Sequence, residues 1–248
     1  MLRKARIPEL RWRDTVSQVA VLQRLNSVER HRLRELASEF LQVKAFSGAG
    51  GLVLNAEMRT LIAAQACLLI LELDLGYFDG WHEIIVYPDP FVVRRDEIDT
   101  TGLVHATRHV LGGEAWSRGP VVLSWSDARP GAYPHGEGSN VILHEFAHKL
   151  DMLNGAANGM PPLHKDMRLE TWTRVFQHAY DDLYRRREHH HHSCIDNYAL
   201  ENPAEFFAVT TEIFFENPQC IVHLYPELYD QLQQFYRQDP LRRQSNQN

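Results

Sequence analysis

Residues 141–151 read VILHEFAHKLD and carry the spacing H-E-x-x-H. In a helix, residues four apart lie one above the other, with β-carbons ~5–6 Å apart, so His144 and His148 can reach a single ion from one face. Glu145 lies one position further round, where its carboxylate can hold the metal's water, while the apolar residues face a core. Chance supplies only about 0.06 such matches in a chain of this composition. The stretch therefore predicts a helix that binds metal on one side and is anchored on the other.

A catalytic zinc site typically has three protein ligands and leaves a fourth position for water or substrate. The best candidate for the third ligand is Glu205, in the stretch NPAEFFA, where Asn202 caps a helix and Pro203 takes its first position. Two alternatives stay open. Glu205 could instead return a hydrogen bond to the Asn202 backbone in a capping box, and Glu212 and Glu216 share roughly the same helical face as competing ligands.

The roles of three further groups of side chains near these motifs can be interpreted in two ways. Tyr198 is either a phenol that donates a hydrogen bond to an oxyanion or a packed core tyrosine. Asp151, one turn after His148, either orients an imidazole or only terminates the helix. The run from His189 to His192 cannot direct all its imidazoles at one ion in a regular element, so we expect a solvated loop that binds metal adventitiously.

The remaining pattern predicts an α+β chain that is mostly helical with a small mixed sheet. We expect helices after a cap at Asn26 or Ser27, after a cap at Asn55, from Met167 to Leu183, and from a cap at Ser139 or Asn140 that starts the metal helix. We expect strands from Trp81 to Tyr87 and from Val121 to Trp125.

The size and composition indicate one catalytic unit. A chain of 248 residues with 44% hydrophobic residues can bury a sizeable core. We expect residues 1–248 to form one domain, with residues 1–50 as an N-terminal helical segment packed on it. The formal net charge of −6 argues against a general affinity for nucleic acid or for anionic membranes.

The chain also has the features of a cytoplasmic protein. Its N-terminus does not resemble a secretory signal, and the apolar run from Leu61 to Leu73 is too short for the ~20 residues of a membrane helix. Three cysteines, Cys67, Cys194 and Cys220, are few, odd in number and widely spaced. We therefore expect reduced, packed thiols rather than disulfides.

The stretch HEFAHKLD, together with NPAEFFAV from Asn202 onward, resembles the Mlc titration factor A family of bacterial zinc peptidases. The similarity extends to Ile62–Cys67, Val86–Pro88 and Phe235–Pro240, and the spacing from Tyr198 to Glu205 also resembles that of the more distant anthrax lethal factor catalytic domain. The resemblance implies a zincin-like fold, aminopeptidase activity and binding of the glucose repressor Mlc. It also implies one Zn²⁺ held by His144, His148 and Glu205, with Glu145 as the catalytic carboxylate and Tyr198 in the active site.

The expected function is therefore that of a zinc metallopeptidase. Zinc lowers the pKa of its water toward ~7, so Glu145 can act as the general base in peptide hydrolysis. The alternative is a non-catalytic protein that sequesters a repressor and keeps a vestigial or structural zinc site. The intact Glu145 argues against that alternative, because a structural site needs no general base and tends to close its fourth position with a protein ligand. The sequence identifies neither the substrate nor an anchor for its α-amine.

Overall fold

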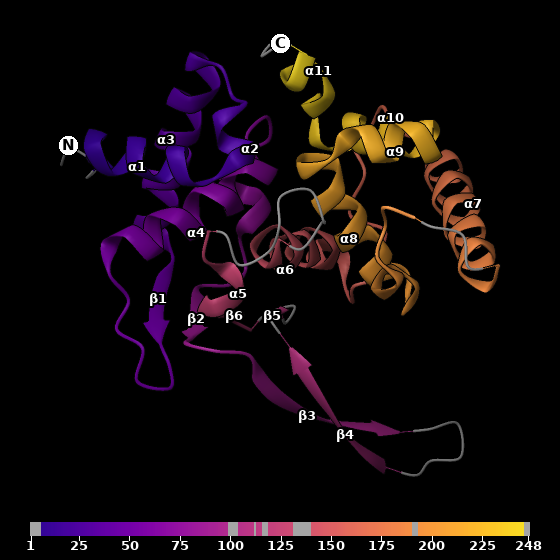
Figure 1. Cartoon of the computed structure of the whole chain (residues 1–248), viewed down its shortest axis with the longest axis horizontal. Helices are drawn as coiled ribbons and strands as arrows, with labels where there is room; N and C mark the ends of the chain where they lie inside the picture. Colours follow the sequence, from indigo (N-terminus) through magenta and orange to yellow (C-terminus); the bar gives the residue numbers. More distant parts are fainter. Residues whose placement is uncertain are drawn as a thin grey trace.

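Helices form most of the structure, a computed structural model that describes residues 6–98, 104–111, 113–115, 119–130, 140–189 and 193–245 (Figure 1). The described helices are α1 (Glu9–Gln18), α2 (Ala20–Gln23), α3 (Ser27–Val43), α4 (Ala56–Leu69), α5 (Trp125–Ala128), α6 (Val141–Asp151), α7 (Leu169–Glu188), α8 (Pro203–Glu216), α9 (Pro218–Leu224), α10 (Pro226–Tyr236) and α11 (Pro240–Ser245). Short 3₁₀ turns lie at η1 (Leu75–Phe78), η2 (Met152–Asn154) and η3 (Asn197–Leu200). The prediction of a mostly helical chain is confirmed.

A small mixed sheet, also as predicted, lies beneath these helices. Its strand order is β1 (Ala45–Gly48), β2 (Glu83–Tyr87), β6 (Val121–Ser124) and β5 (Gly113–Ala115). The first three strands are parallel and β5 pairs antiparallel with β6. Because parallel neighbours require a crossover connection, α4 joins β1 to β2. Helix α6 packs on this sheet through β5 and β6.

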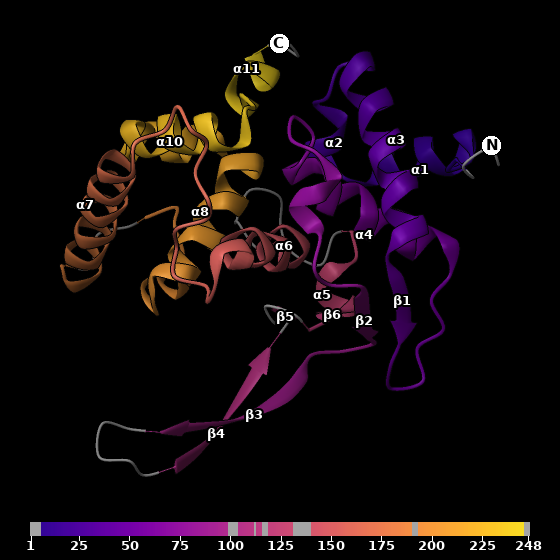
Figure 2. The same ribbon diagram turned by 180° about the vertical axis from the view of Figure 1, so that it is seen from behind.

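A second sheet is a two-stranded hairpin that lies outside the expected elements. It consists of β3 (Phe91–Ile98) and β4 (Val104–Leu111), which pair antiparallel from Phe91 opposite Leu111 to Ile98 opposite Val104. Views from the front and from behind show that this hairpin extends away from the helices (Figures 1 and 2). The metal helix therefore lies in the helical body and not in the projecting arm.

Asn26 and Asn55, two of the predicted caps, begin α3 and α4, which both contact α6. Asn26 accepts from the backbone N–H groups of Val28 and Glu29, and the Glu29 side chain returns a bond to the Asn26 backbone, which makes a full capping box. Asn55 caps α4 by accepting from Met58 N–H at 2.8 Å. Helix α4 is buried along most of its length. Across the described residues, no helix combines the length and the apolar character needed to span a bilayer.

The apolar side of α6 is anchored by a cluster of aromatic rings. The ring of Phe146 lies 5.8 Å from Phe40, 5.3 Å from Phe78 and 5.8 Å from Trp81, measured between centroids. Two buried lysines flank Trp81, with Lys44 Nζ 3.9 Å and Lys149 Nζ 4.9 Å from the centre of its ring. Lys149 also donates to Gly119 O at 2.8 Å. Burial lowers the pKa of both amines to about 8. Rings and cation–π contacts thus fix α6 against α3, η1 and the segment before β2.

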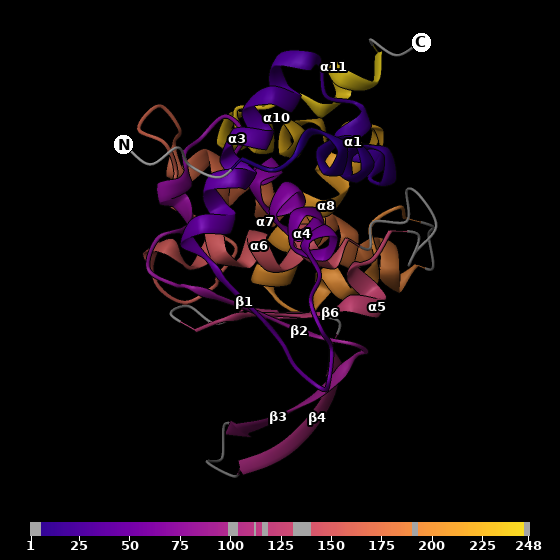
Figure 3. The same ribbon diagram turned by 90° about the vertical axis from the view of Figure 1, so that its left-hand side faces the viewer.

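Helix α8 packs against α6 on one side and against the C-terminal helices on the other. Phe206 and Phe207 of α8 contact the rings of Phe176 and Trp172 of α7, at 6.0 and 6.1 Å. Phe235 of α10 completes the cluster, 6.0 Å from Phe207. Figure 3 shows this helical layer above the strands of the main sheet. The apolar packing of α8 therefore decides where its polar face meets α6.

The expectation of three reduced, separate thiols is wrong for two of them. Cys194 and Cys220 form a disulfide, whereas Cys67 is a buried free thiol. The two bonded cysteines are 26 residues apart, and the intervening α8 returns the chain so that α9 lies beside the segment before η3. Whether two cysteines this far apart form a disulfide depends on how the chain folds between them and cannot be read from their spacing in the sequence. The cytoplasmic location and the assignment of residues 1–248 to one domain stay predictions.

Candidate metal centre

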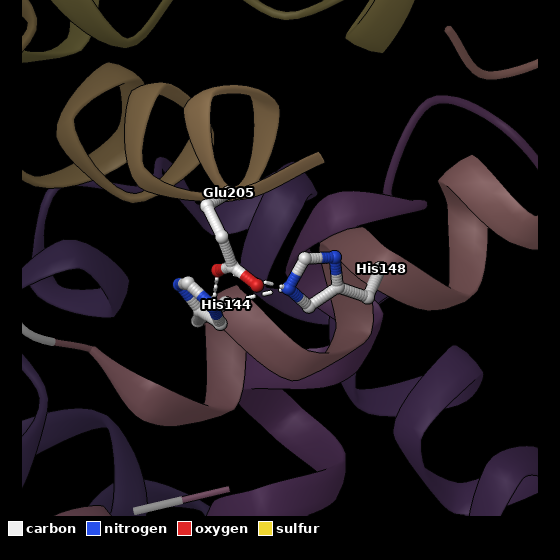
Figure 4. Close-up of side chains that lie close together, drawn as sticks. All are labelled: His144, His148 and Glu205. Carbon is white, nitrogen blue, oxygen red and sulfur yellow. Dashed lines mark hydrogen bonds and ion pairs between the residues drawn. The ribbon is translucent and has the colours of Figure 1, made fainter. Parts of the chain in front are cut away.

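Three side chains from two helices converge at the contact between α6 and α8. His144 and His148 come from α6 and Glu205 comes from the first turn of α8 (Figure 4). The Nε2 atoms of the two imidazoles are 3.1 Å apart. Glu205 Oε2 lies 2.9 Å from His144 Nε2 and 3.3 Å from His148 Nε2. The pair at spacing i, i+4 thus faces a carboxylate that is 61 residues from His144 in the sequence.

This donor set fits a metal ion. One ligand atom from each of the three residues lies within 4.8 Å of the others. Ligands ~2.0–2.1 Å from a tetrahedral zinc ion would be roughly 3.4 Å apart, close to the separations observed here. Two buried imidazole nitrogens that face each other beside a carboxylate need a shared proton or a cation between them, because two facing lone pairs would repel each other. The three residues could therefore hold a metal ion between them.

The charges in the cluster shift its pKa values in opposite directions. Burial lowers the pKa of His144, but hydrogen bonds to Glu205 and Glu212 outweigh it and hold that pKa well above its usual range. Burial raises the pKa of Glu205, but hydrogen bonds from the two imidazoles outweigh it and hold that pKa far below its usual range. Burial raises the pKa of Glu212 to about 7. The pocket thus favours cationic charge at His144 and anionic charge at Glu205.

Glu145 is buried beside this cluster. It follows the first histidine on α6, and only 4% of its surface is exposed. Its charge contributes to the raised pKa values of both His144 and Tyr198, which places the carboxylate close to these two side chains. A carboxylate held next to the donor set and shielded from bulk water can exchange protons with a molecule bound there.

Tyr198 lies at the same cluster in the short turn η3, just before α8. Its ring centroid is 5.9 Å from that of His144, and the residue is 41% exposed. Desolvation, followed by the charges of Glu205, Glu201 and Glu145, raises the pKa of the phenol. Tyr198 is therefore not the packed core tyrosine of the alternative reading, and it keeps its proton at neutral pH.

Asp151 orders the loop that follows α6. Its carboxylate accepts hydrogen bonds from the backbone N–H groups of Asn158, Gly159 and Met160 at 2.9, 2.7 and 2.8 Å. Gly159 has φ 78°, and a Cβ there would lie 2.4 Å from Pro203 O. The loop therefore rests directly on the first residue of α8, two positions before Glu205. Asp151 is the last residue of α6, so the reading in which it ends the helix describes its position, and its carboxylate binds loop amides in addition.

The competing carboxylates lie elsewhere in the site. Glu212 Oε1 contacts the other ring nitrogen of His144, Nδ1, at 2.7 Å, and Glu216 accepts from the side chain of Asn140 at 2.9 Å. Asn140 caps α6 through Leu143 N–H, as one of the two predicted caps, whereas Ser139 and His190 to His192 lie outside the described residues. Gln65, which accepts from Asn140 at 2.7 Å, was not among the predicted site residues. Its signal is a polar side chain inside an apolar helical run, which requires a buried partner.

Comparisons with known proteins identify relatives of this chain. Residues 1–237 match the family model described as glucose-regulated metallo-peptidase M90. Proteins named Mlc titration factor A from Yersinia pestis (strain Pestoides F) and from Yersinia pseudotuberculosis serotype O:1b (strain IP 31758) are each 39% identical to this chain over 236 residues. The matched region covers 94% of this chain and 86% of each relative. The chain therefore belongs to the M90 family of glucose-regulated metallo-peptidases.

Proposed function

We propose that this chain is a zinc-dependent peptidase, acting as an aminopeptidase, whose ligands are His144, His148 and Glu205. The observation that carries the proposal is the convergence of these donors within 4.8 Å, with Glu145 beside them, in a chain of a metallo-peptidase family. Two imidazoles and one carboxylate form a common catalytic zinc set that leaves a position for water or substrate. The aminopeptidase activity is supported by the family resemblance alone.

The chemistry divides between the ion and the side chains. A bound zinc ion would make water more acidic and polarise the peptide carbonyl. Glu145 would accept a proton from the attacking water and deliver it to the departing amine, because a buried carboxylate next to both groups can serve each transfer. The Tyr198 hydroxyl, which keeps its proton, would donate a hydrogen bond to the carbonyl oxygen as negative charge develops there.

The ligand set predicts the order in which variants lose metal. Glu205→Ala should weaken zinc binding by more than the ~10–100-fold typical of losing an outer-shell partner, because it removes a donor. Glu170→Ala is a matched control, since Glu170 also lies in the first turn of a helix but is exposed. Metal analysis and chelator competition measure the effect. All proteins should carry Ser in place of His189 to His192, and unchanged affinity in Glu205→Ala would remove Glu205 from the ligand set.

If Glu145 is the general base, a variant without its carboxylate should still bind metal but should not cleave peptides. Glu145→Gln should keep zinc and fold and lose roughly 10²–10⁴-fold in peptide turnover, the typical contribution of general acid–base catalysis. Glu170→Gln should leave turnover unchanged. Mass spectrometry of digested peptide libraries measures cleavage and tests at the same time whether single residues leave from the amino terminus. Near-normal turnover by Glu145→Gln at full zinc occupancy would rule out this mechanism.

The proposed oxyanion donor predicts a loss in kcat rather than in KM. Tyr198→Phe removes only the hydroxyl, and one such donor is worth ~3–4 kcal/mol in the transition state. Tyr184→Phe is the matched control, because Tyr184 is 42% exposed and lies on α7. Steady-state kinetics at equal zinc content give the comparison. A change confined to KM would make Tyr198 a residue that binds substrate.

A second function, binding of the Mlc repressor, is suggested by the name of the relatives. We propose that Mlc docks away from the metal centre, because protein–protein affinity comes from a few anchoring residues on a wide patch. Binding and cleavage would then be separable activities.

Calorimetric titration of Mlc against wild type and Glu145→Gln distinguishes the two arrangements. The substitution changes one buried atom and little of the shape, so the affinity for Mlc should stay the same while peptide cleavage is lost. A tenfold weaker complex would instead place Mlc in the active site, as a substrate or as a competitive plug.

A further inference from the structure

Glu212 is a buried carboxylate whose two oxygens contact two different groups. It lies two turns beyond Glu205 on α8 and is 3% exposed. Its Oε1 is 2.7 Å from His144 Nδ1, and its Oε2 accepts a hydrogen bond of 2.6 Å from the backbone N–H of Asn140. The opposite ring nitrogen, His144 Nε2, faces Glu205 and His148. Glu212 therefore sits on the far side of the ring and cannot ligate the same ion.

We propose that Glu212 is the positioning residue of this metal centre, which sets the tautomer and the orientation of His144. An ionised carboxylate only accepts hydrogen bonds, so it keeps the proton of a neutral imidazole on Nδ1. The lone pair of Nε2 is then directed at the space between His148 and Glu205. This inference rests on the proposed metal site but not on peptidase activity.

Glu212 is itself held in place by the cap of the metal helix. Asn140 donates its backbone N–H to Glu212, and its Oδ1 accepts from Leu143 N–H at 3.1 Å. Its Nδ2 donates to Gln65 at 2.7 Å and to Glu216 at 2.9 Å. One residue therefore starts α6 and fixes the carboxylate that fixes His144. A rotation of the His144 ring would break a connected network, not a single bond.

The second histidine lacks this arrangement. His148 Nδ1 is buried, and within the described part of the chain it has no hydrogen-bond partner. Asp151, which follows His148 by one turn of α6, is already engaged by three loop amides. A carboxylate thus specifies the orientation of His144, whereas in the described residues no hydrogen bond to Nδ1 specifies that of His148. We therefore expect the metal affinity to depend strongly on Glu212.

A pair of Glu→Gln substitutions on α8 tests the proposal. Glu212→Gln replaces one acceptor oxygen by an NH₂ group. That NH₂ group must face either His144 Nδ1–H or the Asn140 N–H, and both of these are donors that need an acceptor. Glu216→Gln is the matched control one turn later, because Glu216 contacts the Asn140 side chain and its single remaining oxygen can still accept that bond. Both variants remove one charge from the same helix.

Zinc dissociation constants from competition with a chromogenic chelator give the first readout. Glu212→Gln should weaken zinc binding ~10–100-fold, whereas Glu216→Gln should stay near the wild-type value. The visible spectrum of the Co²⁺-loaded proteins gives the second readout and should change only in Glu212→Gln, since it reports the ligand field and not stability. Equal zinc affinity in the two variants would overturn the proposal.

Nuclear magnetic resonance of zinc-loaded wild type tests the tautomer even if Glu212→Gln does not fold. With ¹⁵N-labelled histidine, the ring proton of His144 should be on Nδ1 and exchange slowly; a proton on Nε2 would overturn the inference. The outcomes also separate this inference from the proposed function. Tight zinc binding that depends on Glu212, without peptide cleavage, would refute only the peptidase activity. Normal cleavage with unchanged zinc affinity in Glu212→Gln would refute only the role of Glu212.

Discussion

The contact between α6 and α8 is the constraint on which the candidate metal centre depends. It buries His144, Glu145 and Glu212, and burial of charged groups costs free energy unless they are paired. Each of the three candidate metal donors, His144, His148 and Glu205, has an atom within 3.3 Å of another donor, so their charges compensate one another only as a group. A cation between them would reduce this cost further, because it replaces shared protons with a fixed positive charge.

Both ends of α6 are fixed, and each attachment reaches α8. At its start, Asn140 caps the helix and binds Glu212; at its end, Asp151 orders the loop whose Gly159 lies against Pro203. The rings around Phe146 hold the middle of the helix against α3, η1 and the segment before β2. Donors held on rigid, doubly attached elements keep their mutual distances, which is what metal affinity and catalysis require.

Local sequence was sufficient for the features that depend on residues a few positions apart. The i, i+4 spacing of His144 and His148 places both imidazoles on one helical face wherever that helix lies. The Asn26 and Asn55 caps and the Asn202-Pro203 start of α8 satisfy the first N–H groups of their own helices, so they too could be predicted without the fold. The family resemblance favoured Glu205 over Glu212 and Glu216 and an active-site role for Tyr198, but it did not give the distances between these residues.

Only the tertiary structure distinguished residues with the same local pattern. Glu205 and Glu212 lie on one face of α8 at a separation of two turns, and the position of α8 against α6 places one beside Nε2 of His144 and the other beside Nδ1. The disulfide between Cys194 and Cys220 and the bonds of Asp151 to loop amides likewise depend on the path of the chain between them. The sequence by itself determined which side chains share a helical face, because helical periodicity is local; the packing of α8 on α6 decided their partners, because that geometry is set by contacts between distant residues.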